Sequence, residues 1–239
     1  AKFHMPNIHK LCLRSRDQSL RHLVKNLKPK KKQDDCSMTE GGKLVFYYDY
    51  VDPGSYLMDQ LIDELMEDKQ DLILHPLEIC PPTIIPIDPT NPEWVDYNKK
   101  VQQLRKQSHL KCTYPISPPW SRKAHELRLY ARKNNTERSV HKEIFRAYFQ
   151  QHLDIGRIDI LVAIASNSGL SRSECKATLD VDRYSAEIQK LGLEAQGDGI
   201  MNAPVLKTEA GSLEGPTNIC ELRKFLKRSE ITLSSDGSS

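Results

Sequence analysis

The turn Asp52-Pro53-Gly54-Ser55 holds the side chains of this sequence that are best placed to do chemistry. It separates an apolar run with strand composition, Leu44 to Val51, from a helical pattern in which apolar residues recur three or four positions apart: Leu57, Leu61, Leu65 and Met66. A helix that follows a strand directly aims its first free N–H groups at the turn, and anions and thiolates are stabilised there. The turn is therefore the first candidate for a functional site.

The same residues can also be explained by a structural role. Asp52 would cap the helix by accepting hydrogen bonds from its free N–H groups, and Ser55 would occupy the first turn. Pro53 suits an early helical position under either interpretation. We expect the capping role.

The elements around the turn are predicted from hydrophobic spacing and turn residues. A second strand is expected to end at Pro81-Pro82, a short surface helix covers 94–109, and a helical block follows with Ser171 and Glu174 as a capping box. Two strands then meet at the turn Ala210-Gly211, before a helix over 217–227. This order predicts an α/β thioredoxin-like fold, strand-helix-strand and strand-strand-helix, with a large all-helical insertion.

The predicted segments divide the chain into five regions, and 239 residues suffice for one good-sized core. A basic arm and linker is followed by the two halves of the thioredoxin-like domain with the insertion between them, and by a tail: 1–43, 44–119, 120–195, 196–228 and 229–239. The apolar runs are too short to cross a bilayer, so we expect no membrane insertion.

The net charge of +3 conceals an asymmetry between the arm and the body. Residues 1–33 hold ten Lys or Arg and a single acid, Asp17, whereas the remaining 206 residues hold 25 basic and 31 acidic side chains. The arm is predicted to be a basic amphipathic helix that contacts a partner, either RNA phosphates or an acidic protein surface, if it is not simply solvated. The residues expected to do so are Arg14, Arg16, Arg21, Lys25, Lys28, Lys30, Lys31 and Lys32.

The arm also suggests a location. An Arg-rich, acid-poor amphipathic N-terminus resembles a mitochondrial transit peptide, and the first residue is alanine, so we expect a trimmed chain on the matrix side of mitochondria rather than in the cytoplasm.

The cysteines and histidines do not suggest a redox pair or a metal site. The six cysteines lie far apart, without a CxxC, which indicates a reducing compartment and buried or inert thiols: Cys12, Cys36, Cys80, Cys112, Cys175 and Cys220. His125 and His141 stand near Glu126 and Glu143, but no metal-ligand spacing exists. We expect both histidines to be surface or half-buried residues.

Four segments in order carry a resemblance to a known family: FYYDYVDPGSY, AHELRLYARKNN, KEIFRAYFQQHLDIGRIDILVAIASNSGLS and GIMNAPVLKTEAG. Together they resemble the DsbA-like thioredoxin-fold superfamily, in the branch that holds FrnE-type oxidoreductases, hydroxychromene-carboxylate isomerases and kappa-class glutathione transferases. The resemblance spans about residues 44–228. It implies a cis peptide at Ala203-Pro204, facing the first turn.

The chain departs from that family where its chemistry is done. The resemblance implies Cys-Pro-x-Cys at the turn in the oxidoreductases and a Ser-Pro-Tyr-Ser-like sequence in the serine branch. This sequence has Asp52 at the first position of the turn and Ser55 at the last. Thiol–disulfide exchange needs a thiolate, and an ionised Asp52 would repel the thiolate of glutathione. By the same resemblance, Thr217 occupies the position at which the kappa enzymes use an acidic residue to hold the γ-glutamyl amine of glutathione. Trp120 is bulky at a position where the branch tends to have a small polar residue.

These departures predict a degenerate active site with no catalytic residue and no cofactor, consisting of Asp52, Pro53, Gly54, Ser55, Ala203 and Pro204. We expect a structural or accessory subunit of a large, mitochondrial assembly such as a ribosome, a respiratory complex or an ATP synthase. Two alternatives stay open. One is a kappa-type glutathione-dependent transferase or isomerase that uses Ser55, and the other is a peptide-binding or chaperone-like module without redox chemistry.

Overall fold

The computed structural model describes residues 43–67, 72–81, 90–108, 112–113, 118–229, 231 and 233. The predictions for the basic arm, including its eight partner-binding Lys and Arg residues, and for most of the tail lie outside the described residues.

A mixed four-stranded sheet forms the centre, with strand order β2-β1-β3-β4. β1 (Leu44–Tyr48) pairs in parallel with β2 (Leu72–Pro76) and antiparallel with β3 (Val205–Thr208), which pairs with β4 (Gly211–Glu214). The parallel pair requires a crossover, which the helix after β1 provides. Most side chains of β1 are buried, so the strand lies in the middle of the core.

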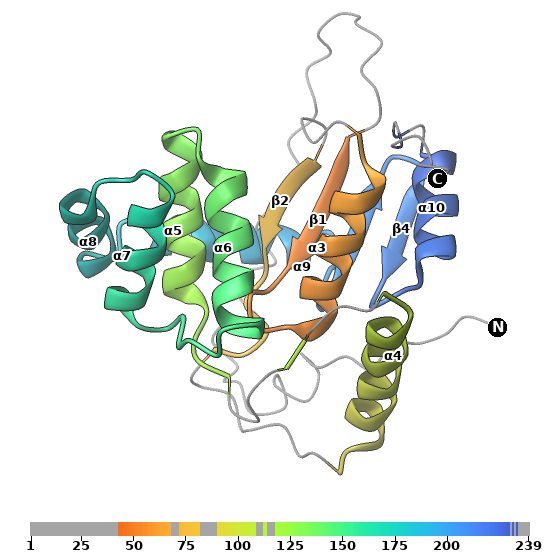
Figure 1. Cartoon of the computed structure of the whole chain (residues 1–239). Coiled ribbons are helices and arrows are strands. Elements are labelled where there is room, and N and C mark those ends of the chain that lie inside the picture. The colour runs from red at the N-terminus through yellow and green to blue at the C-terminus, as the bar shows by residue number, and fades with distance from the viewer. Residues whose placement is uncertain are drawn as a thin grey trace, which may run out of the picture.

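Helices cover both faces of the sheet (Figure 1). α3 (Pro53–Leu65) and α10 (Ile219–Arg228) lie on one face, and α9 (Ser185–Gly197) lies on the other. α4 (Pro92–Ser108) packs against α3 near the end of the sheet where β1 leads into the turn.

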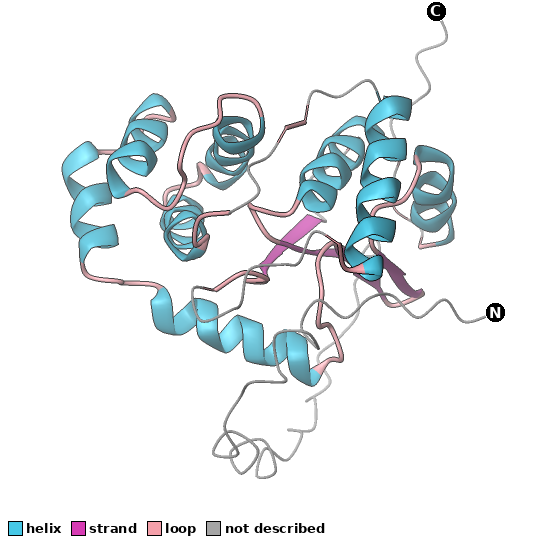
Figure 2. Ribbon diagram, turned by 90° about the horizontal axis from the view of Figure 1, so that it is seen from below, coloured by secondary structure: helices cyan, strands magenta, loops and turns pink. Residues whose placement is uncertain are grey.

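The inserted helices form a block beside β2, the edge strand of the sheet, and the view from below shows helices on several sides of the strands (Figures 1 and 2). The block consists of α5 (Arg122–Lys133), α6 (Glu137–Phe149), α7 (Ile158–Asn167) and α8 (Arg172–Asp180). Its buried side chains belong to the same continuous core as those of the sheet.

The fold confirms the predicted order of elements. Of the predicted capping box it shows the Ser171 half, in which Ser171 Oγ accepts from the N–H of Glu174 at 3.4 Å, while the Glu174 carboxylate accepts from the Tyr130 hydroxyl at 3.0 Å. Two predictions need correction. The second strand ends at Pro76 rather than at Pro81-Pro82, because soon after it, at Ile79, the backbone N–H donates to the Asp49 side chain and not to the neighbouring strand. The helix predicted on the surface is half buried, because Tyr97, Val101 and Leu104 pack into the core.

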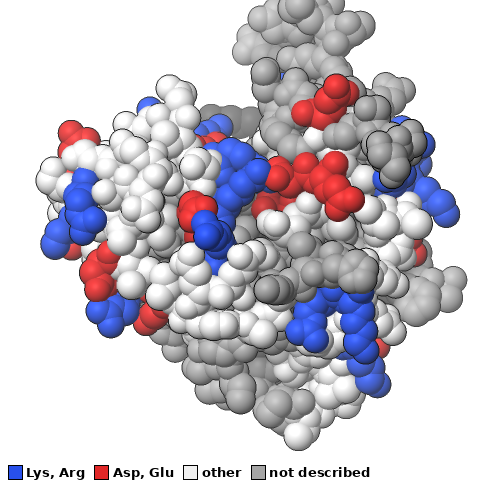
Figure 3. Space-filling view, in the orientation of Figure 1, with Lys and Arg blue, Asp and Glu red and all other residues white. Residues whose placement is uncertain are grey.

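Opposite charges are paired where α3 meets α6, and Figure 3 shows acidic and basic side chains next to one another there. Arg138 bonds Asp59 at 2.8 Å and Asp63 at 3.0 Å, and Lys142 bonds Asp63 at 2.5 Å. The cations with which α6 faces α3 are therefore paired with the protein's own carboxylates.

Within the described part of the chain, each helix is too short or too polar to cross a bilayer.

Candidate functional site

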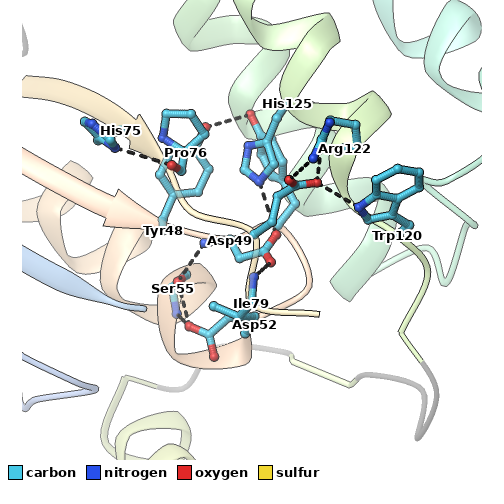
Figure 4. A network of polar contacts seen from close by, with 12 residues as sticks. Tyr48, Asp49, Asp52, Ser55, His75, Pro76, Ile79, Trp120, Arg122 and His125 are labelled. Carbon is cyan, nitrogen blue, oxygen red and sulfur yellow. Dashed lines mark hydrogen bonds and ion pairs between the residues drawn. The ribbon is translucent and has the colours of Figure 1, made fainter. Parts of the chain in front are cut away.

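Asp52 caps α3, as the sequence predicts. Its backbone is extended, and its Oδ2 accepts from the backbone N–H of Ser55 at 2.5 Å and from the Ser55 hydroxyl at 2.6 Å. The Ser55 oxygen in turn accepts from the backbone N–H of Asp49 at 3.3 Å, which ties the helix to the end of β1 (Figure 4). The hydrogen of the Ser55 hydroxyl is thus committed to Asp52.

The hydroxyl of Tyr97 on α4 closes the turn from outside by donating to Asp52 Oδ1. The space for it exists because residue 54 is glycine. A Cβ atom at position 54 would overlap the Tyr97 oxygen and would lie 3.1 Å from Cδ of Pro204. The turn, α4 and the Ala203-Pro204 segment therefore meet at one point.

The structure brings all six predicted residues of the degenerate site together and buries all of them. Asp52 is 1% exposed, the Ala203-Pro204 peptide is cis, and Pro204 contacts the turn. The neighbouring positions are buried as well: Pro53, Gly54, Ser55 and Ala203. Asp52 and Ser55 are therefore shielded from solvent.

Burial dominates the electrostatics of Asp52. Desolvation raises its pKa to about 6, although the hydrogen bonds from Ser55 and Tyr97 favour the ionised form. A carboxylate with this pKa is partly protonated near neutral pH, which is unusual for a simple helix cap.

The raised pKa of Asp52 gives a prediction for stability against pH. The folded protein binds the Asp52 proton more tightly than the unfolded chain, so this contribution to stability is complete below about pH 4 and is lost as pH rises through about 6. Asp52→Asn should remove a decline of up to about 3 kcal/mol between pH 4 and 7. Urea unfolding of both proteins across this range measures the difference, and parallel pH curves would contradict the assignment.

The cap itself is tested by removing the side chain. At pH 5, Asp52→Ala should lower the free energy of unfolding by about 0.5 to 2 kcal/mol, because two donors at the start of α3 lose their acceptor. Asp52→Asn keeps an acceptor oxygen and should cost less. An Asp52→Ala protein as stable as the wild type in the same urea titration would rule out the cap.

A second buried carboxylate, Asp49, joins the end of β1 to the segment that follows β2 and to the helical block (Figure 4). Its Oδ2 accepts from the backbone N–H of Ile79 at 2.8 Å, and its Oδ1 lies 3.2 Å from Nε2 of His125 on α5. Asp49 and His125 are fully buried, and Nδ1 of His125 has no partner among the described residues. Because a buried carboxylate and a buried histidine contact each other here, the pair connects the end of β1 to the helical block.

Trp120 lies at the outer end of this connection. Its indole N–H donates to Glu78 at 2.8 Å, and Glu78 also accepts two bonds from the guanidinium of Arg122, which lies over the Trp120 ring. The Trp120 side chain is 42% exposed. It is thus held on the surface and does not enter the turn.

His141 and His125 were expected to be surface or half-buried residues, and both predictions are wrong, because both side chains are fully buried. His141 is fully buried, with Nδ1 2.9 Å from the hydroxyl of Tyr50 and Nε2 3.1 Å from Asp59. Burial lowers the pKa of His141. Burial would raise the pKa of Asp59, but His141 and Arg138 outweigh it and hold that pKa at about 2. The histidines are therefore core residues that need an acidic partner.

The described cysteines form no disulfide, and no group of side chains in the described ranges could hold a metal ion. Cys112 and Cys175 are buried as expected, but Cys220 is exposed. Burial, opposed by Arg105 and reinforced by the nearby Asp52, raises the pKa of Cys112 to about 12. Cys112 is therefore a thiol at neutral pH and cannot replace the missing cysteine of the turn.

Thr217, which differs from the family pattern, lies beside an acidic residue at the start of α10. The Thr217 hydroxyl donates to the carboxylate of Glu221, and the Asn218 side chain caps α10 by accepting from the N–H of Glu221 at 2.9 Å. Glu221 therefore supplies a negative charge one turn after Thr217, but its carboxylate is engaged by the Thr217 hydroxyl at the start of α10.

The sequence interpretation missed Tyr97 and Asp49. The spacing of Trp94, Tyr97, Val101 and Leu104 marks one apolar side of α4 and could have shown that Tyr97 faces inward. Asp49 follows an apolar strand and precedes the turn, a position in which a buried carboxylate needs a partner. The pattern could not identify His125 as that partner.

Known proteins resemble this chain in sequence and in fold. The family model described as DSBA-like thioredoxin domain matches residues 43–213. The uncharacterised protein YwbO of Bacillus subtilis is 27% identical over 153 residues, 62% of this chain and 76% of that protein.

Two solved structures share the fold. A probable DsbA oxidoreductase from Streptomyces coelicolor superposes with a TM-score of 0.63 at 15% identity, over 79% of this chain and 89% of that one. A 2-hydroxychromene-2-carboxylate isomerase superposes with a TM-score of 0.60 at 15% identity, over 77% of this chain and 94% of that one. Both likenesses are likenesses of fold.

Proposed function

The chain belongs to the DSBA-like thioredoxin domain family, and we propose that it is a catalytically inactive member that works by being bound. The observation that carries this proposal is the closed turn. Asp52 stands at its first position, is almost fully buried, and is covered by the hydroxyl of Tyr97. A reactive group in this family would need both a thiol or hydroxyl at that position and room for a substrate beside Pro204.

The chemistry of the remaining side chains supports the loss of redox activity. Thiol–disulfide exchange proceeds by attack of a thiolate on a disulfide, and neither Asp52 nor Ser55 can supply one. Cys112 has a pKa raised to about 12 and is buried. The family's dithiol reaction is therefore chemically impossible at this turn.

A glutathione-dependent transferase or isomerase is the second candidate, because Ser55 retains a hydroxyl and one similar fold is that of an isomerase. Two contacts weigh against it. The Ser55 hydroxyl donates to Asp52 at 2.6 Å, so its hydrogen is not available to a thiolate, and Tyr97 occupies the space in front of the turn. A peptide-binding module meets the same obstacle, because the Ala203-Pro204 backbone is buried.

We assign the binding role to an accessory subunit of a larger assembly. The body is a compact folded unit of overall negative charge, and the arm adds a charge of +9 within 33 residues, far more than such a unit needs for solubility. An arm of this kind suits a tether to RNA or to an acidic protein surface. Placement in the mitochondrial matrix, and the choice among ribosome, respiratory complex and ATP synthase, stay predictions from the arm alone.

Reduction of insulin disulfides tests the inactive turn. We expect the wild-type protein to show no rate above the uncatalysed reaction with dithiothreitol, because it has no reacting pair. Asp52→Cys/Ser55→Cys restores the pair at the start of α3, where the helix stabilises a thiolate, and should recover measurable activity if the scaffold is intact. Wild-type turnover that disappears in Asp52→Ala would overturn the proposal.

A further inference from the structure

The outer faces of α4 and α10 form a second candidate site, separate from the turn. Figure 3 shows basic side chains over both helices on one side of the molecule. Both helices bury their apolar side chains and turn their cations outward. The exposed cations are Lys99, Lys106, Lys224, Lys227 and Arg228.

These five cations lack an acidic partner within the part of the chain that the structure describes. Elsewhere in the body most cations are paired: Arg122 with Glu78, Lys123 with Asp182, Arg138 with Asp59, Arg157 with Asp159 and Lys176 with Asp180. A cation that is not held in an ion pair stays available to an external anion, although Asp96 on α4 and Glu221 on α10 reduce the local positive charge. The α4 and α10 faces are therefore anion-attracting surfaces on a body whose overall charge is negative.

The residues between these cations indicate the kind of anion. Specific protein interfaces contain an apolar centre with aromatic anchors. Val95 is the single exposed large apolar side chain on these helices among the described residues. The side chains that line the same open hollow of α4 as Lys99 and Lys106 are mostly amides, Asn98, Gln102 and Gln103. Lysines and arginines contact phosphates, and amides contact sugars and bases.

We propose that the outer faces of α4 and α10 bind the phosphodiester backbone of a nucleic acid. This inference rests on the proposed function, because it names the class of partner that holds the inactive body. It adds a folded surface to the arm, so that the body itself contributes contacts. The cations on α10 lie on consecutive turns of one helix, which allows them to meet successive phosphates.

Fluorescence anisotropy of the full-length protein with a labelled 20-nucleotide single-stranded RNA tests the proposal, with a DNA of the same sequence as a second probe. Lys224→Glu/Lys227→Glu should weaken RNA binding by about tenfold or more and lower the slope of log K against log salt by about 1 to 2. The matched control, Arg172→Glu/Arg183→Glu, makes the same charge change at the start of α8, at the far end of the helical block, and in the turn that follows α8, and it should change affinity by about twofold at most.

Each outcome decides the question. Equal weakening by both double variants would show a nonspecific effect of net charge, and strong competition by poly-glutamate would show a protein-type surface; either result overturns the inference. Weaker binding to DNA than to RNA would identify RNA as the source of the phosphates, and equal binding would identify the backbone alone. If Lys224→Glu/Lys227→Glu does not fold, Lys224→Gln/Lys227→Gln should still lower the salt slope. A negative result in the RNA-binding experiment would not bear on the inactive turn, because insulin reduction tests the activity of the turn separately.

Discussion

Gly54→Ala is expected to lower the free energy of unfolding by about 2 to 4 kcal/mol, through overpacking and the loss of one buried hydrogen bond. The new methyl group would overlap the Tyr97 hydroxyl oxygen and press on Pro204, so Tyr97 has to leave Asp52. The ring cannot give way freely, because it is buried and stacked on Trp94 at 5.7 Å between centroids. Equilibrium unfolding in urea measures the loss.

A double-mutant cycle connects the effect to the closed turn. In a Tyr97→Phe background the overlapping oxygen is gone, so Gly54→Ala should cost at least about 1 kcal/mol less than in the wild type. Gly192→Ala on α9 is the matched control, because no atom lies within 4 Å of its added Cβ, and it should be neutral or slightly stabilising. Additive costs for Gly54→Ala and Tyr97→Phe would mean that Tyr97 does not cover the turn in solution.

Removal of residues 1–33 is expected to release most of the protein from the assembly proposed for it while leaving a folded body. The arm carries ten basic residues against one acid, whereas the body has its own core and is negatively charged without the arm. Gradient sedimentation of cell extracts, with tagged full-length and truncated proteins side by side, measures the release. Melting of the purified truncated protein should match that of the full chain.

An arm with most of its charge removed is the control for this truncation. Glutamine at the eight predicted contact positions keeps the length of the arm and lowers the charge of residues 1–33 from +9 to +1, and it should release the protein as truncation does: Arg14, Arg16, Arg21, Lys25, Lys28, Lys30, Lys31 and Lys32. Added salt should weaken the full-length contact steeply for RNA and gently for a protein partner. Truncated protein that still sediments with the assembly would show that the body's own surface holds it.

The fold and the cap were predictable because their signals are local. Asp52 lies three residues before the Ser55 N–H that it accepts, and α3 follows from apolar residues three and four apart. The order of elements around the helical block also follows from such spacing, which is why the α/β architecture was predicted correctly.

The closed turn was not predictable because its contacts join distant parts of the chain. Tyr97 is 45 residues from Asp52, and His125 is 76 residues from Asp49. α5 carries charged residues on most of its turns, so its sequence suggests an exposed helix, and only the position of Asp49 explains why His125 is buried. A carboxylate pKa near 6 likewise depends on burial by segments that the local pattern does not connect.

Calorimetric titration with reduced glutathione tests the inactive, closed turn most directly. The turn lacks a free donor for the thiolate and has Tyr97 in front of it, so millimolar glutathione should produce only heat of dilution with the wild type and with Asp52→Ala alike. Saturable binding to the wild type that weakens at least about tenfold in Ser55→Ala would contradict the account. It would show an accessible Ser55 hydroxyl that serves a glutathione-dependent reaction.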